Sequence, residues 1–150
     1  MCKKLFAALC LALCIVLALT GCSGGSGKEE TTTATPASID VDLTSLSSTM
    51  VYSEVYNMMT KPETYVGKII KMKGPLSILN ASDTGLTYYS IIISDATACC
   101  QQGMEFVWEG HDAADYPPQG TEVTVTGEFQ TYYEGETMYC HLISNDVEFV

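Results

Sequence analysis

The sequence predicts a small, mainly β domain that is preceded by one amphipathic helix. The spacing of apolar residues, which is near three and four before Pro62, changes to two after Tyr65. Clusters of glycine, proline and asparagine then divide the rest of the chain into five runs of strand length. The predicted domain, residues 44–150, is long enough for one hydrophobic core and too short for two.

The helix is predicted between Thr44 and Thr60. Ser48 or Thr49 can cap its start, and Pro62 ends it because the residue before a proline is disfavoured in the helical region. No lysine lies within this stretch to meet anionic lipid headgroups, so we expect its apolar stripe to pack against the domain. The stripe consists of Leu46, Met50, Val51, Val55, Met58 and Met59.

The first two predicted strands lie on either side of a turn cluster at residues 80–85. The first strand is long, and Gly74-Pro75 predicts a bend in its middle. The second strand covers residues 87–94, and its three consecutive isoleucines indicate that both of its faces are covered. The alternating apolar residues of the first strand are Val66, Ile70, Met72, Leu76 and Ile78.

Three further strands are predicted in the second half of the chain. Phe106 and Trp108 lie on one side of the third strand, and Glu134-Gly135 turns the fourth strand back into the fifth. Residues 147–150 either extend the fifth strand or fold back. The three strands cover residues 105–109, 123–129 and 137–143.

Two of these stretches resemble the first and fourth strands of OB-fold modules. They read YVGKIIKMKG, residues 65–74, and GTEVTVTG, residues 120–127. The resemblance covers residues 65–150 and implies a small five-stranded OB-like Greek-key barrel. The connection over residues 110–120, where many OB folds have a helix, is short and contains two prolines. An incomplete barrel or a two-sheet sandwich therefore stays open as an alternative.

The N-terminal region resembles the signal of a bacterial lipoprotein. Two lysines precede an apolar run over residues 5–19, which is shorter than the roughly 20 residues of a membrane-spanning helix. The run ends in Leu19-Thr20-Gly21-Cys22, which is similar to the lipobox. This resemblance implies cleavage of a signal peptide, residues 1–21, and acylation of Cys22 by chains such as palmitate. An ordinary secretory signal or an anchor helix fits the pattern less well.

Composition defines the parts of the mature chain and excludes one class of partner. Residues 22–43 are mostly small or polar and predict a flexible tether between the anchor and the domain at residues 44–150. The mature chain has five lysines, no arginine and eighteen acidic residues, which gives a net charge of −13. Nucleic-acid binding relies on Lys and Arg to neutralise phosphates, so we expect no nucleic-acid partner.

Three cysteines lie in the predicted domain. Outside the cytoplasm, a disulfide from Cys99 or Cys100 to Cys140 is the simplest structural interpretation, with one thiol left over. Buried free thiols are a second alternative. The third is a zinc site, in which these three cysteines and either His141 or His111 supply four ligands, although the sequence has no Cys-x-x-Cys spacing.

The segment around the cysteine pair carries another resemblance. Residues 95–108 read DATACCQQGMEFVW. This segment resembles part of the OB-like soluble domain in a family of bacterial proteins assigned as membrane permease subunits, and it is similar to small uncharacterised lipoproteins. The resemblance implies a membrane-associated accessory module that is linked to transport, with metal ions as one candidate cargo. It brings no catalytic residue.

No motif in the sequence supports an enzyme. A nucleophilic cysteine would need a histidine base and an oxyanion donor pair, and no signature for these is present.

Aromatic residues are numerous, and several are candidates for the face on which OB folds bind oligosaccharides or peptides, although strand packing also favours tyrosine. The candidates for this ligand face are Tyr88, Trp108, Tyr132 and Tyr139.

Taken together, these patterns predict a lipid-anchored, non-enzymatic OB-type module on the outer face of the cell membrane. We expect it to bind or assemble with another envelope protein, with zinc at the cysteines as an option. The alternative function is a glycan- or peptide-binding domain of the cell envelope that uses the tyrosines around Trp108.

Overall fold

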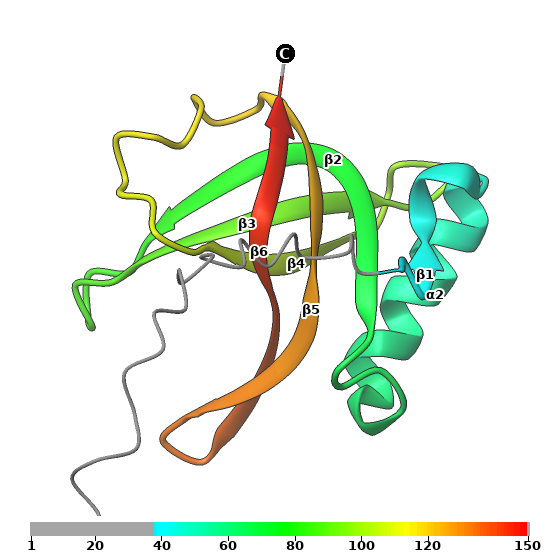
Figure 1. The fold of residues 1–150 in the computed structure, drawn as a ribbon, viewed down its shortest axis with the longest axis horizontal. Helices are drawn as coiled ribbons and strands as arrows, with labels where there is room; N and C mark the ends of the chain where they lie inside the picture. Colours follow the sequence, from blue (N-terminus) through cyan, green and yellow to red (C-terminus); the bar gives the residue numbers. More distant parts are fainter. Residues whose placement is uncertain (1–37, 150) are drawn as a thin grey trace, which may run out of the picture. The chain divides into compact units, whose positions relative to one another are not determined.

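The computed structural model describes residues 38–149, which contain six β-strands and one α-helix (Figure 1). The prediction of a mainly β domain preceded by a helix is confirmed for this range. The predicted signal peptide, Cys22 and most of the predicted tether lie outside the described residues. The elements are β1 (Val41–Asp42), η1 (Leu43–Ser45), α2 (Ser48–Thr60), η2 (Pro62–Thr64), β2 (Ile69–Asn80), β3 (Thr87–Ser94), β4 (Gln101–Trp108), β5 (Glu122–Glu134) and β6 (Thr137–Phe149).

The helix α2 begins later than the apolar spacing suggested. A short 3-10 turn, η1, comes first, because the Asp42 side chain accepts a hydrogen bond from the Thr44 amide at 2.9 Å and starts that turn. The backbone of Ser47 then leads into α2, and Val55 and Met58 become fully buried on its inner face. Among the described residues, no helix is both long enough and apolar enough to cross a bilayer.

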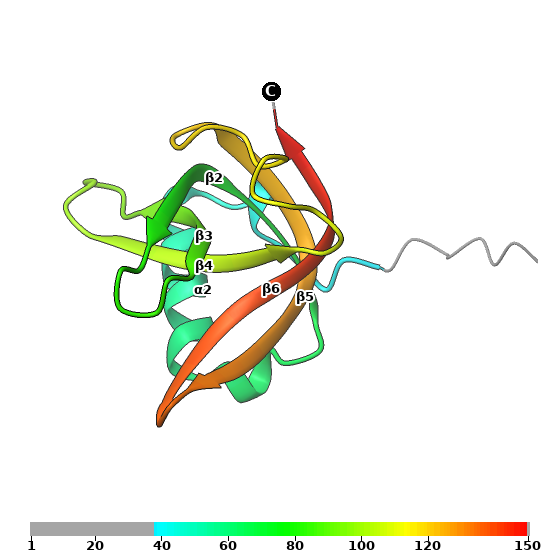
Figure 2. The same cartoon turned by 90° about the vertical axis from the view of Figure 1, so that its left-hand side faces the viewer.

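All six strands belong to one sheet, in the order β1-β2-β3-β4-β6-β5, with an additional pairing between β2 and β5. The pairs β1–β2 and β4–β6 are parallel, and the others are antiparallel. Figure 2 shows β6 between β4 and β5, as the strand order requires. The strand β2 is therefore hydrogen-bonded to β1 and β3, and also to β5 at the far end of the order.

The predicted bend in the first long strand lies at Gly74. The part of β2 up to Pro75 pairs with β5, and the part from Leu76 onward pairs with β3. A Cβ atom at Gly74 would lie 2.7 Å from the carbonyl oxygen of Ile92, so only glycine allows this close approach. Gly127 has the same role where the β5–β6 register shifts, since its Cβ would lie 2.6 Å from the carbonyl oxygen of Ile143.

The core lies between the inner face of this sheet and α2. Its fully buried aromatic residues are Phe106 and Phe129, and Ile91 and Ile93 of the isoleucine run point into it, whereas Ile92 is half-buried. The last strand continues to Phe149, so the residues near the C-terminus extend β6. The remaining core residues are Leu43, Val55, Met58, Tyr65, Ile70, Met72, Leu76, Met104, Val123, Val125, Cys140 and Leu142.

The first described residues, 38–43, belong to the stretch predicted as tether, and they contact the sheet. The strand β1 pairs with Ile70 and Lys71 of β2, and Leu43 is only 2% exposed. The Asp40 carboxylate also accepts a hydrogen bond from the Ile69 amide at 2.8 Å. The contacts that hold these residues come from β2, so their own polar composition gave no indication of them.

Candidate functional site

A cleft of about 340 Å³ lies on the outer face of the sheet. Its walls come from the β2–β3 loop, the first half of β3, the middle of β4 and the end of the β5–β6 hairpin, and the last turn of α2 reaches it through Met59. The residues that line the cleft are Met59, Leu79, Ala81, Asp83, Thr84, Tyr88, Ser90, Gly103, Glu105, Tyr132, Glu134, Tyr139 and Cys140.

Strand pairing places these side chains together. Ser90 pairs with Glu105, and Glu105 pairs in parallel with His141, so the outer face of β3, β4 and β6 is continuous. Tyr132 is directly opposite Tyr139 in the β5–β6 hairpin, and the two rings stack with centroids 5.6 Å apart. Because paired residues share a face of the sheet, the two tyrosines stand beside the row of Ser90 and Glu105.

A hydrogen bond between Tyr132 and Glu105 crosses the cleft. The Tyr132 hydroxyl donates to Oε2 of Glu105 at 2.5 Å. Burial raises the pKa of the half-buried Glu105 carboxyl, and the hydrogen bond from Tyr132 offsets part of that rise. Burial and the neighbouring carboxylate also raise the pKa of Tyr132, so this hydroxyl remains a donor at all physiological pH values.

A second tyrosine–carboxylate pair closes the other side of the cleft. The Tyr88 hydroxyl donates to Oε1 of Glu134 at 2.7 Å, which raises the pKa of Tyr88. The His141 ring lies 4.7 Å from the Tyr132 ring, and burial lowers the pKa of this imidazole. The two pairs join residues 46 and 27 positions apart in the chain, and they fix the hairpin against β3 and β4.

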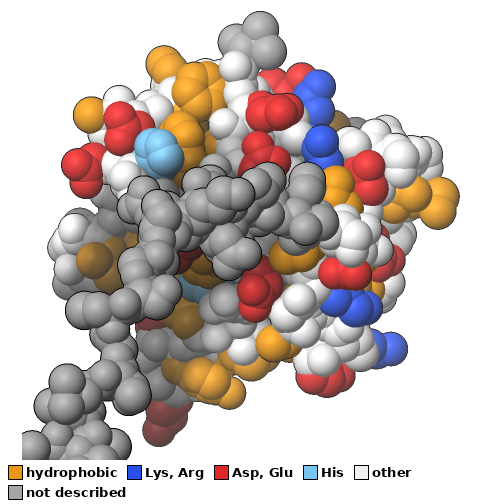
Figure 3. Space-filling view, viewed as in Figure 1, with side chains coloured by type: hydrophobic (Ala, Val, Ile, Leu, Met, Phe, Trp, Pro, Cys, Tyr) orange, Lys and Arg blue, Asp and Glu red, His pale blue; other side chains and the backbone are white. Residues whose placement is uncertain are grey.

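The cleft is acidic and its rim is apolar. Asp83, Glu105 and Glu134 line it, and no lysine is among its lining residues. Figure 3 shows the lysine side chains on the side of the molecule formed by α2 and β2. At the rim, Leu79 is 63% exposed and Tyr139 is 43% exposed. A cationic or hydrogen-bond-donating ligand with some apolar surface fits this combination.

Three of the four predicted ligand-face residues line the cleft, namely Tyr88, Tyr132 and Tyr139. Trp108 does not, because it belongs to an aromatic cluster at the other end of β4. There it stacks on His111 with centroids 3.7 Å apart and contacts Tyr116 and Phe149 edge-on.

The predictions missed the two carboxylates that pair with the tyrosines. Glu105 lies between the buried Met104 and Phe106, so its position in an alternating strand was the available signal that it faces outward. Nothing local indicated that Tyr132 would meet it there. Glu134 had been interpreted only as part of the hairpin turn.

The structure does not bring together the five residues of the predicted disulfide or zinc site. Cys140 is buried in β6 beside Leu142, whereas Cys99 and Cys100 are exposed in the β3–β4 turn, and all three are free cysteines. His141 faces the outer side of β6, next to Tyr132. His111 is stacked on Trp108. Cys140 follows the alternation of β6 into the core and also borders the cleft, whereas the cysteine pair lies beyond the end of β3.

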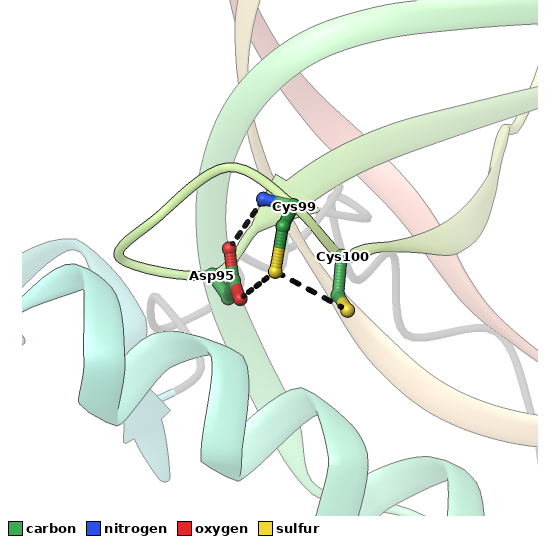
Figure 4. Close-up of side chains that lie close together, drawn as sticks. All are labelled: Asp95, Cys99 and Cys100. Atoms are coloured by element: carbon green, nitrogen blue, oxygen red, sulfur yellow. Dashed lines mark hydrogen bonds between the residues drawn. The ribbon is translucent and has the colours of Figure 1, made fainter.

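The β3–β4 turn instead gathers a smaller group, Asp95, Cys99 and Cys100, which we call the thiol turn (Figure 4). One ligand atom from each residue lies within 4.8 Å of the others, and no other group of three such side chains is found among residues 38–149. Oδ1 of Asp95 accepts a hydrogen bond from the Cys99 amide at 2.9 Å, and Oδ2 accepts one from the Cys99 thiol at 3.2 Å. The two sulfur atoms are 3.7 Å apart.

The backbone of the thiol turn is tight and strained. The Asp95 amide donates to the carbonyl of Cys100 at 3.0 Å, and Ala98 has a positive φ of 54°. The hydrogen bond from the Cys99 thiol lowers the pKa of Asp95. The hydrogen bond between the Cys99 and Cys100 thiols raises the pKa of Cys100.

Comparison of the chain with known protein families finds no family that matches it, and comparison with curated proteins finds no relative.

Proposed function

We propose that this chain is a lipid-anchored, extracytoplasmic, non-enzymatic binding module of the OB type, and that the acidic cleft is its ligand site. The OB assignment is supported by the pairing order β2-β3-β4-β6-β5 with a return to β2, and by the parallel pair β4–β6. The face of the second and third barrel strands, between the loops after strands one and four, is where OB folds bind their ligands. The cleft lies between the corresponding loops β2–β3 and β5–β6.

The observation that carries the ligand assignment is the convergence of three carboxylates and three tyrosines without a cation. An anionic ligand would meet uncompensated repulsion there, which disfavours phosphate backbones. A lysine or arginine side chain would form an ion pair with Asp83 or Glu134 and a cation–π contact with a tyrosine ring. The best-supported ligand is therefore a cationic peptide segment of another envelope protein, such as the transporter subunit that the sequence resemblance implies.

A cell-wall glycan is the second candidate, and the stacked pair Tyr132 and Tyr139 favours it. Tyrosine rings offer flat apolar faces beside the carboxylates of Glu105 and Glu134, which accept hydrogen bonds from donors such as sugar hydroxyl groups. Such binding would depend on the rings and only weakly on salt.

Calorimetric titration of the detergent-solubilised full chain tests both candidates. The probes are a trilysine peptide with blocked termini and triacetylchitotriose. Glu134→Gln should weaken peptide binding about tenfold, whereas Glu136→Gln, which removes the same charge outside the cleft, should not. Equal weakening in both variants would mean that only net charge attracts the peptide. Stronger binding of the glycan, lost on Tyr139→Leu and kept on Tyr133→Leu, would select the second candidate.

The anchor is tested separately. Cys22→Ala should release the chain from the membrane fraction. Two or three acyl chains hold a protein stably on a bilayer, and this variant has no site to carry them. Mass spectrometry of the wild-type chain should show cleavage before Cys22 and added acyl mass. An unmodified chain of full length would contradict this part of the proposal.

A further inference from the structure

The thiol turn is separate from the cleft, which lies nearer the start of β3, and the proposed function does not use it. Cys99 and Cys100 are exposed residues, and Asp95 beside them is a partly exposed residue. Two thiols and a carboxylate, all reachable from outside and converging within 4.8 Å, are more than ordinary turn chemistry requires. A single aspartate would suffice to cap the turn.

We propose that Asp95, Cys99 and Cys100 bind one Zn²⁺ ion through two thiolates and one carboxylate oxygen, with water at the fourth position. Zinc favours thiolate, imidazole and carboxylate ligands in tetrahedral geometry. On binding, the two thiol protons are released to solvent, and the carboxylate exchanges its thiol hydrogen bond for the metal. Three protein ligands with an open fourth position would hold the ion at the surface.

The distance between the two sulfur atoms is compatible with a shared zinc ion. Two sulfur atoms at about 2.3 Å from a tetrahedral zinc ion lie about 3.8 Å apart. The observed separation between Cys99 Sγ and Cys100 Sγ is 3.7 Å, so the pair already has the required spacing. Cys99 Sγ and Asp95 Oδ2, at 3.2 Å, need to separate by only about 0.3 Å to share the ion.

The main competing fate of the pair is a disulfide between adjacent residues. Consecutive Cα atoms across a trans peptide are about 3.8 Å apart, which is shorter than the roughly 4.4–6.8 Å found in disulfides. The described residues contain no cis peptide bond, so that spacing applies to Cys99 and Cys100. The turn geometry therefore favours a shared metal over a direct bond.

The local strain also fits a ligand role. Ala98 holds a left-handed backbone conformation, which is unfavourable for residues other than glycine. This residue directly precedes Cys99, and the amides of Thr97 and Cys99 both donate hydrogen bonds to Asp95 Oδ1. The chain thus maintains a strained turn that orients one sulfur toward the other two ligand atoms.

Competition between the reduced, chelator-treated full chain and a chromophoric zinc chelator tests the proposal. We expect one zinc ion per chain, and more than about 100-fold weaker binding in Cys99→Ser and in Cys100→Ser, since even second-shell changes can cost that much. Asp95→Asn should weaken binding about 10-fold or more. Cys140→Ala, which removes a buried thiol outside the turn, is the matched control and should leave zinc affinity unchanged.

Spectroscopy of the wild-type chain gives a readout that does not depend on variants. Co²⁺ substituted for zinc should show thiolate charge-transfer absorption and tetrahedral ligand-field bands, with two sulfur ligands by X-ray absorption. A reduced chain that binds no zinc overturns the proposal, as does binding that survives Cys99→Ser. A chain in which Cys99 and Cys100 are joined and take up no zinc after reduction overturns it in favour of a redox pair.

Discussion

The cleft and the thiol turn share the strands β3 and β4, yet they are assembled in opposite ways. In the cleft, the pairs Tyr88–Glu134 and Glu105–Tyr132 join residues 46 and 27 positions apart. In the thiol turn, the longest side-chain contact, between Cys99 and Asp95, spans four positions. The cleft therefore exists only when the whole sheet is formed, whereas the turn needs little more than its own backbone.

The two sites are therefore sensitive to different changes. A change that moves the β5–β6 hairpin should abolish the cleft and leave the ligand atoms of the turn in place. A change within the turn should leave the sheet and the cleft unaffected.

Gly127→Ala should break the cleft while sparing the thiol turn. The new Cβ would lie 2.6 Å from the carbonyl oxygen of Ile143, so the β5–β6 register has to shift. We expect the free energy of unfolding to fall by about 2–3 kcal/mol in urea titrations, as in other overpacked sites. The control is Gly103→Ala in β4, where the Cβ would be 3.5 Å from its nearest neighbour and the stability should hardly change.

Tyr132→Phe tests the long-range pair that fixes the hairpin. The variant keeps the ring and removes the hydroxyl donor to Glu105, so the half-buried carboxylate loses its partner. We expect a loss of about 1 kcal/mol in the free energy of unfolding. In a double-mutant cycle with Glu105→Gln, the two changes should be coupled. Additive effects would show that the two side chains do not interact in solution.

The same contrast in contact range explains which parts of the structure could be predicted. The helix, the strands and the bend at Gly74 follow from local spacing and from turn residues, and these are all present in the structure. The predicted third strand begins too late and the predicted fifth strand ends too early. In the structure, β4 starts at Gln101 and β6 continues to Phe149, because both pair with neighbouring strands that local patterns do not reveal.

The candidate sites divide in the same manner. Tyr88, Tyr132 and Tyr139 could be proposed for a ligand face because tyrosines in strands are visible in the sequence, but Trp108 could not be excluded from it. Its separation from the cleft depends on the packing of Tyr116 and Phe149 around it. For the cysteines, compartment chemistry suggested a long-range bridge to Cys140, whereas the structure favours the local partner, Asp95.

Glu105→Gln should change stability in a way that depends on pH. Burial raises the pKa of Glu105 above its unfolded value of 4.5, so its favourable contribution is complete below pH 4.5 and is lost as the pH rises through the folded-state pKa. Glutamine stays neutral throughout. Relative to the wild type, the variant should therefore gain stability as the pH rises above 4.5. The gain should stay below about 1 kcal/mol because the site is only half-buried. A difference that is constant with pH would contradict the burial of this carboxyl.

Asp95→Ala should have the smallest effect on the whole molecule and a clear effect on the turn. The variant removes the acceptor for the amides of Thr97 and Cys99 while the sheet pairings of β3 and β4 remain. Hydrogen exchange of these two amides should become faster, and the urea midpoint and peptide binding in the cleft should stay unchanged. A lower midpoint or weaker peptide binding would mean that the turn supports the sheet. The two sites would then be one cooperative unit.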